Sequence, residues 1–433
     1  MIWNPAESAS REEIEATQLA RLRETARRVY AISPFYKKRF DEAGVHPEAI
    51  RSLEDLRTLP FTRKQDLRDH YPFGLFCVPM SEVVRIHSSS GTTGKPTVVG
   101  YNAHDMDVWN EVMARVYAMS GVGASDVVHN GYGYGLFTGG LGFHTGAEKI
   151  GAAVVPASGG FTDRQLMLMR DFGATVLACT PSFALHLAEI AAKAGKDFRK
   201  DYKLKTGIFG AEPTSKGLKE AVAQAWEIDY HEVYGLSEII GPGVSCSCKQ
   251  SDRLHIFEDH FLAEIIDPKT GEVLPEGERG ELVITTLTKQ ALPIIRYRTG
   301  DITSITQEPC ACGRTHARME SIVGRADDML IVNGVNVYPS QVEHVIANTE
   351  GVTLNYQIVA DKKGHLDKLE IQVEVDEGIL VDDVGAMERI KKSIQHNLLN
   401  NLYINADVKL VEPGTIERSM GKAVRIVDKR QAQ

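Results

Sequence analysis

The chain has 433 residues, of which 43% are hydrophobic and 25% charged, as in folded globular proteins. This composition excludes a disordered, collagen-like or disulfide-scaffold chain, and the length predicts one large domain plus a smaller one, or two to three domains. Lysine and arginine number 49 against 58 acidic residues, a net charge of −9, so no general basic field exists for nucleic acid or an anionic membrane. An anionic ligand must therefore be met by local donors.

The N-terminal segment MIWNPAESASREEIEATQLARL is acidic and lacks the basic and apolar regions of an export signal. The sequence also lacks a run of about 18 apolar residues, the length that a membrane-spanning helix needs. We therefore expect a cytoplasmic protein without a membrane partner. Ser10 followed by Glu13 predicts a capping box, and the apolar spacing from Ile14 to Val29 predicts an amphipathic helix after it.

Between residues 80 and 240, short apolar runs ending in glycine or proline alternate with helical stretches, for example DVVHNGYGY, ATVLACTPS and KTGIFGAEP. Such alternation indicates parallel strands joined by crossover helices, and ligands of such sheets bind at the carboxyl ends of the strands. We therefore expect the chemistry of this chain in the loops that follow these strands.

The pattern changes twice in the C-terminal half. Shorter β-like pieces with turn signals predict a mostly antiparallel, β-rich sub-domain at about residues 245–325. Further on, strict alternation from Leu369 to Val375 predicts a strand, and helical spacing from Met387 to Leu398 predicts a helix. The expected fold class is α/β: a large N-terminal domain of parallel α/β layers with this sub-domain, residues 1–326, plus a small mobile C-terminal α+β domain, residues 327–433.

A loop rich in hydroxyl groups and glycine follows the apolar segment VVRI. Glycines allow the backbone to wrap closely around an oxyanion, and hydroxyl and amide groups donate hydrogen bonds to it. The loop is not a Walker A motif, because Ser89 stands where glycine is required and Pro96 occupies the Ser/Thr position. The alternative is a flexible surface loop. The candidate phosphate-binding residues are Ser88, Ser89, Ser90, Gly91, Thr92, Thr93, Gly94 and Lys95.

Five further motifs follow this loop: GAEP at 210–213, YGLSE at 234–238, YRTGD at 297–301, GRADD at 324–328, and Gly421-Lys422. In this order and spacing the six motifs resemble the adenylate-forming acyl-CoA synthetase superfamily. Within it, the WNPAE start, LHIFEDHF, ALPIIRYRTGD and MLIVNGVNVYPSQVE resemble phenylacetate-CoA ligases. The resemblance covers essentially the whole chain.

The resemblance implies a two-step reaction. An aryl carboxylate attacks the α-phosphate of ATP to give an acyl-adenylate and pyrophosphate, and the thiol of coenzyme A then displaces AMP to give the thioester. The implied cofactors are ATP, Mg²⁺ and coenzyme A. The expected partners are these small molecules and the aryl carboxylate, with no nucleic acid, and a homodimer is the assembly to test.

The resemblance also assigns roles to individual residues. Lys422 would bridge the carboxylate and the α-phosphate as the catalytic lysine, Glu238 would approach Mg²⁺, and Asp327 would be the hinge of the small domain. Taken alone, a charged residue is more often a solvated side chain with little effect. The remaining residues would contact the nucleotide: Gly210, Ala211, Glu212, Pro213, Tyr234, Gly235, Ser237, Asp301 and Arg325.

The segment from Tyr132 to Phe137 combines aromatic rings with glycines at a predicted strand end and resembles the acyl pocket of this family. Rings separated by small residues make a flat slot for an aryl group. The alternative is aromatic core packing interrupted by a glycine-rich turn. The candidate pocket residues are Tyr132, Tyr134, Gly135 and Phe137.

Four of the six cysteines occur as two close pairs, whereas Cys77 and Cys179 stand alone in apolar surroundings that predict core positions. Three thiolates and an imidazole are enough for a closed tetrahedral Zn²⁺ site, which would be structural because it leaves no open position. The predicted ligands are Cys248, His255, Cys310 and Cys312, with Cys246 and His316 as alternative ligands and metal-free thiols as the alternative state.

Two other functions remain open from the sequence. Relatives that resemble this family transfer AMP to a deazaflavin cofactor, so the acceptor need not be coenzyme A. A nucleotide-binding or zinc-stabilised scaffold without turnover is the third hypothesis. Lys422, Glu238 and the intact hydroxyl-rich loop argue against the scaffold.

Overall fold

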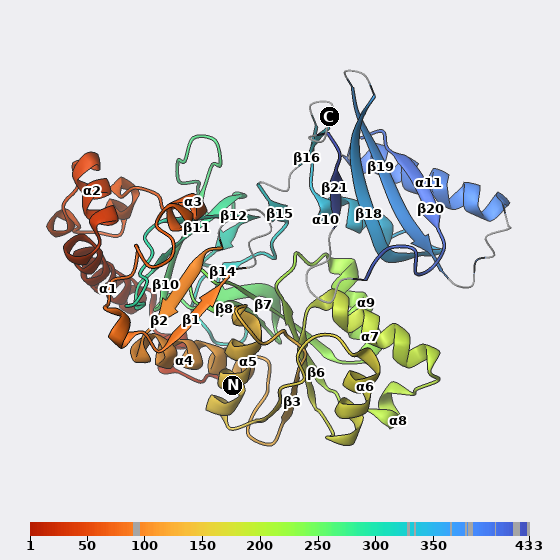
Figure 1. Cartoon of the computed structure of the whole chain (residues 1–433), viewed down its shortest axis with the longest axis horizontal. Helices are drawn as coiled ribbons and strands as arrows, with labels where there is room; N and C mark the ends of the chain where they lie inside the picture. The colour runs from red at the N-terminus through yellow and green to blue at the C-terminus, as the bar shows by residue number, and fades with distance from the viewer. Residues whose placement is uncertain are drawn as a thin grey trace. The chain divides into compact units, whose positions relative to one another are not determined.

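The structure is a computed structural model that describes residues 1–89, 96–326, 330–332, 335–363, 366–376, 379, 384–402, 404–418 and 425–430. The chain forms two compact units, which we describe separately (Figure 1). The first unit comprises Met1–Cys179, Gly195–Ala211 and Glu227–Ser321, and the second comprises Thr180–Ala194, Glu212–Trp226 and Ile322–Gln433. The proposed hinge residue Asp327 lies outside the described residues, and the expected boundary at 326/327 stays a prediction.

The first unit is built on a nine-stranded mixed sheet of order β13-β14-β9-β8-β7-β6-β5-β3-β4. From β4 to β7 all pairings are parallel, and from β7 to β13 all are antiparallel. The strand bounds are β3 Val127–Asn130, β4 Ala153–Val155, β5 Val176–Cys179, β6 Thr206–Gly210, β7 Asp229–Leu236, β8 Gly241–Cys248, β9 Ser251–Ile256, β13 Ile305–Thr306 and β14 Arg318–Met319. The predicted parallel strands are therefore confirmed.

Two neighbouring parallel strands of the sheet, β5 and β6, are buried along their whole length. Such burial is expected for parallel strands covered on both faces. Cys179, at the end of β5, is fully buried, which confirms its core position. Helix α4 (Ala103–Met119) packs against α5 (Thr138–Ile150), and both pack against β8. The other helices of this part are α6 (Thr162–Asp171) and the short α8 (Phe198–Asp201).

The predicted β-rich stretch is divided between two sheets. Strands β8, β9, β13 and β14 extend the nine-stranded sheet, whereas β10 (Phe261–Ile266), β11 (Gly280–Thr286) and β12 (Tyr297–Thr303) pair antiparallel in a separate sheet. A two-stranded antiparallel sheet, β1 (Arg85–Ser88) with β2 (Val98–Tyr101), brackets the hydroxyl-rich loop.

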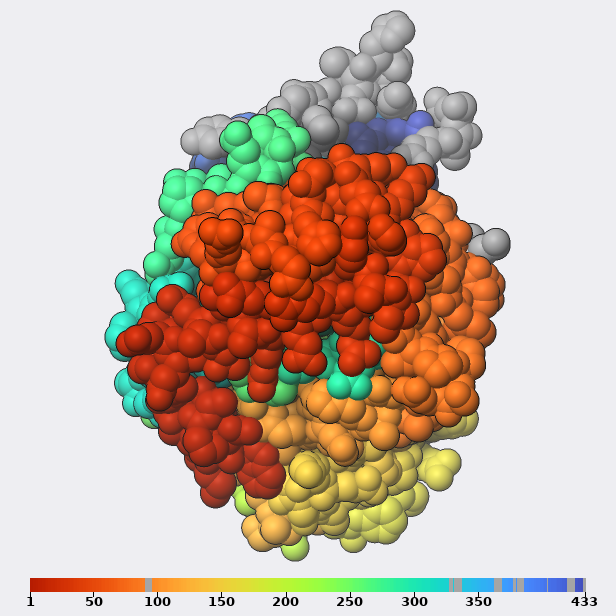
Figure 2. Space-filling model, turned by 90° about the vertical axis from the view of Figure 1, so that its left-hand side faces the viewer, coloured from red at the N-terminus to blue at the C-terminus, as the bar shows by residue number. Residues whose placement is uncertain are grey.

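The N-terminal helices cover the separate sheet. Helix α1 begins with the predicted capping box, in which Ser10 accepts from the Glu13 amide and the Glu13 side chain accepts from the Ser10 amide. The apolar face of α1 shares a hydrophobic cluster with Leu262, Leu287 and Ile295. Figure 2 shows these N-terminal helices, in red, spread across one face of the molecule. The elements are α1 Arg11–Ile32, α2 Pro34–Ala43, α3 Lys64–Asp69 and the 3-10 helices η1 Pro5–Ser8, η2 Pro47–Ala49, η3 Glu54–Thr58 and η4 Met80–Glu82.

The second unit contains a small α+β core, as expected. Its four-stranded sheet has the order β20-β19-β18-β21, in which β18 and β19 are antiparallel and the two outer pairings are parallel. The predicted strand is confirmed: Leu369, Ile371 and Val373 of β19 are buried in one core with Ile394 and Leu398 of α11, and Val375 is also buried. The alternation breaks at Glu374, which is fully buried and forms an ion pair with Arg418. The elements are α7 Pro181–Lys193, α9 Lys216–Trp226, β15 Gly324–Arg325, β16 Leu330–Val332, β17 Val335–Val337, α10 Pro339–Ala347, β18 Val352–Lys363, β19 Leu366–Val375, α11 Val384–Leu402, β20 Asp407–Val411 and β21 Ile426–Asp428.

Candidate functional site

The hydroxyl-rich loop begins and ends on paired backbone. Ser88 pairs with Val98 across β1 and β2, and the Ser89 amide donates to the carbonyl of Thr97 at 3.0 Å. The hydroxyls of Ser89 and Thr97 also share a hydrogen bond. The loop therefore leaves and rejoins a fixed hairpin. The other predicted phosphate-binding residues, 90–95, lie outside the described residues.

Glu238 lies in the turn between β7 and β8, and only 5% of its surface is exposed. Its Oε1 accepts from the Thr97 hydroxyl at 3.3 Å and lies 3.7 Å from the Lys64 ammonium. The fold thus brings Glu238 to the hairpin that carries the hydroxyl-rich loop. Sequence reasoning did not identify Thr97 or Lys64, although Thr97 follows that loop closely in the chain.

Ser237 precedes Glu238 in the same turn, and its hydroxyl shares a 3.0 Å hydrogen bond with that of Thr138 at the start of α5. The turn is therefore fixed to α5. This contact was also missed from the sequence, because the two hydroxyls lie far apart in the chain.

Tyr234 and Asp301 are directly joined. The Tyr234 hydroxyl donates to Oδ2 of Asp301 at 2.6 Å, and both residues are 9% exposed. Tyr234 lies near the end of β7 beside Gly235, and Asp301 lies in β12, so the hydrogen bond joins the main sheet to the separate sheet. Two residues predicted to contact the nucleotide are thus neighbours, linked by a hydrogen bond that sequence reasoning did not predict.

The GAEP segment leaves the end of β6 by a tight backbone path. A side chain at Gly210 would place its Cβ 2.2 Å from the Val233 carbonyl, and Ala211 has a φ of 71°, in the left-handed region. Such backbone is costly for a residue other than glycine and is frequent at functional sites.

Glu212, Pro213 and Arg325 belong to the second unit. The Glu212 carboxylate accepts from the amide and hydroxyl of Ser182, at 2.6 and 2.9 Å. It therefore caps the first turn of α7, where a negative charge is favourable.

The predicted acyl-pocket residues occupy two environments. Tyr132 is buried and stacks on Phe143, with ring centroids 4.5 Å apart. Tyr134 accepts from the Asn130 amide at 2.8 Å, and its hydroxyl shares a 3.1 Å hydrogen bond with Nδ1 of His144. Gly135 has a φ of 143°, and Phe137 is 40% exposed at the start of α5. The segment therefore begins in a buried stacked pair, Tyr132 with Phe143, and ends at the exposed ring of Phe137.

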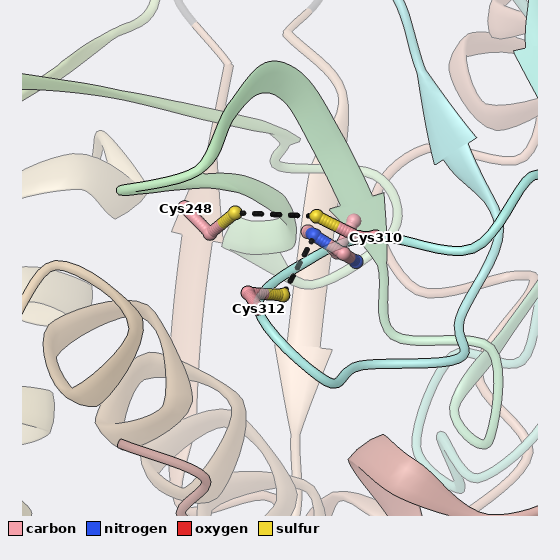
Figure 3. Close-up of side chains that lie close together, drawn as sticks. Cys248, Cys310 and Cys312 are labelled. Carbon is pink, nitrogen blue, oxygen red and sulfur yellow. Dashed lines mark hydrogen bonds between the residues drawn. The ribbon is translucent and has the colours of Figure 1, made fainter.

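The predicted metal ligands lie together in the first unit. Cys248 ends β8, His255 lies in the adjacent strand β9, and the two remaining cysteines follow β13 (Figure 3). One candidate ligand atom from each of the four residues lies within 4.8 Å of the others: Cys248, His255, Cys310 and Cys312. Residues separated by about sixty positions are therefore brought to one point by the antiparallel half of the sheet.

The distances within this cluster suit zinc. The Sγ atoms of Cys248 and Cys310 are 3.7 Å apart, and Sγ of Cys312 lies 3.5 Å from Nε2 of His255. Tetrahedral zinc with Zn–S bonds of about 2.3 Å separates two sulfur ligands by about 3.8 Å. Hydrogen bonds from Cys248 and then from His255 hold the pKa of Cys312 below its ordinary value.

The alternative ligands have other surroundings. Cys246 is fully buried, donates to the Ser247 carbonyl at 3.3 Å, and has its pKa raised to about 12 by burial. His316 is also buried, and burial lowers its pKa to about 4. Neither residue is part of the four-residue cluster found within the described residues.

The segment that carries the last two cysteines is tied to the N-terminus. Arg314 Nε donates to the buried Glu7 carboxylate at 2.5 Å, and the Thr315 amide donates to the Glu7 carbonyl at 3.1 Å. The WNPAE segment therefore anchors the cysteine loop.

The proposed catalytic lysine, Lys422, and the proposed hinge residue, Asp327, both lie outside the described residues.

Among the described residues, every helix is too short or too polar to cross a membrane.

Comparison with known proteins bears on the whole chain. Residues 39–288 match the family model described as AMP-binding enzyme, and residues 334–430 match the AMP-binding enzyme C-terminal domain. A phenylacetate-coenzyme A ligase of Thermus thermophilus is 49% identical over 100% of both chains. A phenylacetate-coenzyme A ligase of Escherichia coli is 46% identical over 99% of this chain and 97% of its own.

A crystal structure of 2-hydroxyisobutyryl-CoA ligase, in the postadenylation state with R3-HIB-AMP, matches with a TM-score of 0.93 at 29% identity. The match covers 99% of this chain and 92% of that one. Together with the six ordered motifs, these full-length matches show that the chain belongs to the AMP-binding enzymes and, within them, to the phenylacetate-coenzyme A ligase family.

Proposed function

We propose that the chain is an ATP-dependent acid–thiol ligase that converts an aryl carboxylic acid such as phenylacetate to its coenzyme A thioester, with AMP and pyrophosphate as co-products. The observation that carries this proposal is the full-length identity of 46–49% to phenylacetate-coenzyme A ligases. The same relatives favour coenzyme A over a deazaflavin as the acceptor. The expected partners are the three small-molecule substrates.

The first half-reaction brings a weakly nucleophilic carboxylate to the polyanionic triphosphate, so charge must be neutralised locally. The chain's net charge of −9 makes local cations and backbone donors necessary. We assign this role to residues 88–95, whose entry and exit are fixed by the hydrogen bonds of Ser89 with Thr97.

The surroundings of Glu238 fit a magnesium ion. Mg²⁺ binds hard oxygen ligands, commonly one or two carboxylates together with substrate phosphates and water. The Thr97 hydroxyl orients the Glu238 carboxylate beside the proposed phosphate-binding loop. In the absence of an ion, the Lys64 ammonium balances the negative charge of this carboxylate. When bound, the ion neutralises the phosphates and the leaving pyrophosphate.

Adenosine binding is assigned to the carboxyl ends of β6 and β7. We propose that the backbone of Gly210 and Ala211 borders the adenine, because it leaves the carboxyl end of β6 at Gly210 and Ala211 holds a left-handed conformation there. The Asp301 carboxylate accepts from the ribose hydroxyls, since a carboxylate accepts from both and donates to neither. The hydroxyl of Tyr234 fixes one Asp301 oxygen in place and thereby orients the other.

The aryl group is assigned to the segment from Tyr132 to Phe137. The stacked pair of Tyr132 and Phe143 provides a flat apolar base, and Phe137 lies at the exposed end of the segment. Tyr134 is held by Asn130 and His144, so its ring cannot turn freely into the slot. A planar ring with a short acidic arm suits these surroundings.

The cluster of three cysteines and His255 is assigned to one structural Zn²⁺. Four protein ligands complete a tetrahedral shell and leave no site for substrate, so the ion would contribute to folding and not to catalysis. Lys422 and the hinge residue Asp327 keep the roles that the family resemblance implies: adenylation, and rotation of the small domain between the half-reactions.

The deciding experiment measures pyrophosphate release over a panel of carboxylic acids, with and without coenzyme A. We expect phenylacetate and close aryl analogues to give the highest kcat/KM, and coenzyme A to be consumed in equal amount to AMP formed. Pyrophosphate release that never yields a thioester would replace coenzyme A with another acceptor. No release with any acid would support the non-catalytic scaffold.

A further inference from the structure

Lys289 is a buried lysine that the proposed mechanism does not use. It lies in the loop between β11 and β12, and only 3% of its surface is exposed. The backbone after it is fixed, because the carboxylate of Asp105 accepts from the amides of Gln290 and Ala291 at 2.6 and 2.9 Å. The residue before it, Thr288, shares a 2.9 Å hydrogen bond with His260. The loop therefore holds Lys289 in a defined place.

The ammonium group of Lys289 points at the turn that carries Glu238. Its Nζ donates to the Glu238 carbonyl at 3.4 Å and lies 4.7 Å from the centroid of the Tyr101 ring. Within the described residues it forms no ion pair with a carboxylate. An ammonium has three donors, whereas Lys289 has one long hydrogen bond and a ring face. The carboxylates of Asp105 and Glu238 act on it electrostatically without forming an ion pair, so its burial is only partly compensated.

The same turn is held at its other end by Tyr101. The Tyr101 hydroxyl donates to the Ile240 carbonyl at 3.0 Å, two residues after the carbonyl that Lys289 contacts. Lys289 and Tyr101 thus hold the backbone of the turn through two of its carbonyls. The side-chain carboxylate of Glu238 is contacted instead by Thr97 and Lys64. A buried, weakly satisfied cation is costly to retain, and its position behind a metal-binding carboxylate offers a reason for it.

We propose that Lys289 is a positioning residue for adenylation. It fixes the peptide of Glu238 so that the carboxylate keeps its orientation toward the divalent cation, and its charge offsets part of the negative charge gathered there by Glu238 and the triphosphate. This inference rests on the proposed function, and in particular on magnesium binding by Glu238. A purely structural lysine would instead affect stability alone.

The test compares Lys289→Met, which keeps an unbranched chain one atom shorter and removes the charge, with Lys289→Arg, which keeps the charge. Lys269→Met is the matched control, because Lys269 is exposed in a turn of the same unit. Each variant is assayed for pyrophosphate release across a Mg²⁺ titration at saturating ATP and acid, and its melting temperature is recorded. Binding of a fluorescent ATP analogue is titrated with Mg²⁺ as a readout independent of turnover.

We expect Lys289→Met to lower kcat at least tenfold and to raise the Mg²⁺ concentration for half-maximal activity and for analogue binding at least threefold. The KM for the acid should stay within twofold. Lys289→Arg should recover most of the Mg²⁺ dependence, and Lys269→Met should match the wild type. If Lys289→Met does not fold, Lys289→Gln takes its place with the same expected result.

Unchanged kcat and Mg²⁺ dependence in a folded Lys289→Met variant would overturn the proposal. So would an equal loss in the Met and Arg variants with Mg²⁺ dependence unaltered, because that pattern is expected of general packing damage. A wild-type protein that releases no pyrophosphate with any acid contradicts the proposed function itself, and this outcome is read before any variant is compared.

Discussion

Replacing Cys310 with serine removes one of the four proposed zinc ligands and tests the metal site. Zinc bound to the folded state alone, at a free concentration about one hundred times its dissociation constant, stabilises that state by about 2.7 kcal/mol. For a domain of 150–250 residues, this corresponds to a melting temperature lower by about 5–10 °C when the ion is lost, and somewhat less for a larger unit. We expect Cys310→Ser to lose both the zinc and this stability.

The assay measures zinc per chain by elemental analysis and the melting temperature of the same samples, with and without a chelator. Cys246→Ser is the matched control, because Cys246 is a buried thiol on the same strand as Cys248 but lies outside the four-residue cluster. It should keep about one zinc per chain even if packing costs it some stability. The KM for ATP should be nearly unchanged in folded Cys310→Ser, since the proposed zinc ligands lie on β8, β9 and the segment after β13, whereas Gly210, Tyr234 and Asp301 lie on β6, β7 and β12.

Purified wild-type protein without zinc would refute the metal assignment. A Cys310→Ser variant that melts at the wild-type temperature, with or without chelator, would show equally that the cluster does not stabilise the fold. The cysteines would then be metal-free thiols gathered by the sheet.

Three other changes separate the remaining roles. Lys422→Ala should abolish acyl-adenylate formation while sparing thioester formation from supplied acyl-adenylate, as measured by single-turnover assays, and equal loss of both steps would contradict its role. Asp327→Pro should slow mainly thioester formation, because proline fixes φ and resists backbone rotation, and an unchanged rate of that step would argue against the hinge. Arg115→Met should cost about 3–5 kcal/mol in denaturant unfolding, because it leaves Asp259 buried without the bidentate pair at 2.7 and 2.9 Å. Burial alone would raise the pKa of the Asp259 carboxyl, but His260 and Arg115 hold that pKa well below its ordinary value. The unfolded state therefore takes up this proton at a higher pH than the folded state does, and the wild type should lose stability as pH falls below about 4. The Arg115→Met variant, without this stabilised carboxylate, should lose less stability over the same pH range.

Local signals in the sequence predicted local structure well. The capping box of Ser10 and Glu13, the parallel strands between residues 127 and 233, and the alternation that ends at Val375 are each determined by residues close together in the chain. The grouping of the cysteines was also predictable, because two close cysteine pairs with a nearby histidine are a typical pattern of metal ligands, and the four residues do lie together.

Pairings between distant segments were not predictable from these signals. The hydrogen bond of Tyr234 to Asp301 joins two sheets, and its two residues are 67 positions apart. The position of Lys289 beside Glu238 depends on the loop between β11 and β12, which Asp105 fixes through the amide of Gln290. Nothing in the sequence around Lys289 distinguishes it from an exposed lysine. The division of residues 245–325 between two sheets likewise follows from β8 pairing with β7, a choice that the alternation of single strands does not encode.

The mixed sheet gives the proposed zinc site a physical reason. Its parallel half carries the strand ends assigned to the nucleotide, whereas its antiparallel half ends in β14 and β13, which contain only two residues each. Such short edge strands contribute few backbone hydrogen bonds and hold the following segment weakly. A metal bound by Cys248 on β8, His255 on β9 and the cysteines after β13 would fasten that edge to the sheet interior. The buried pair of Glu7 with Arg314 holds the same segment from its other side. Loss of the metal should therefore loosen the N-terminal segment before it disturbs the strand ends that we propose to bind the nucleotide.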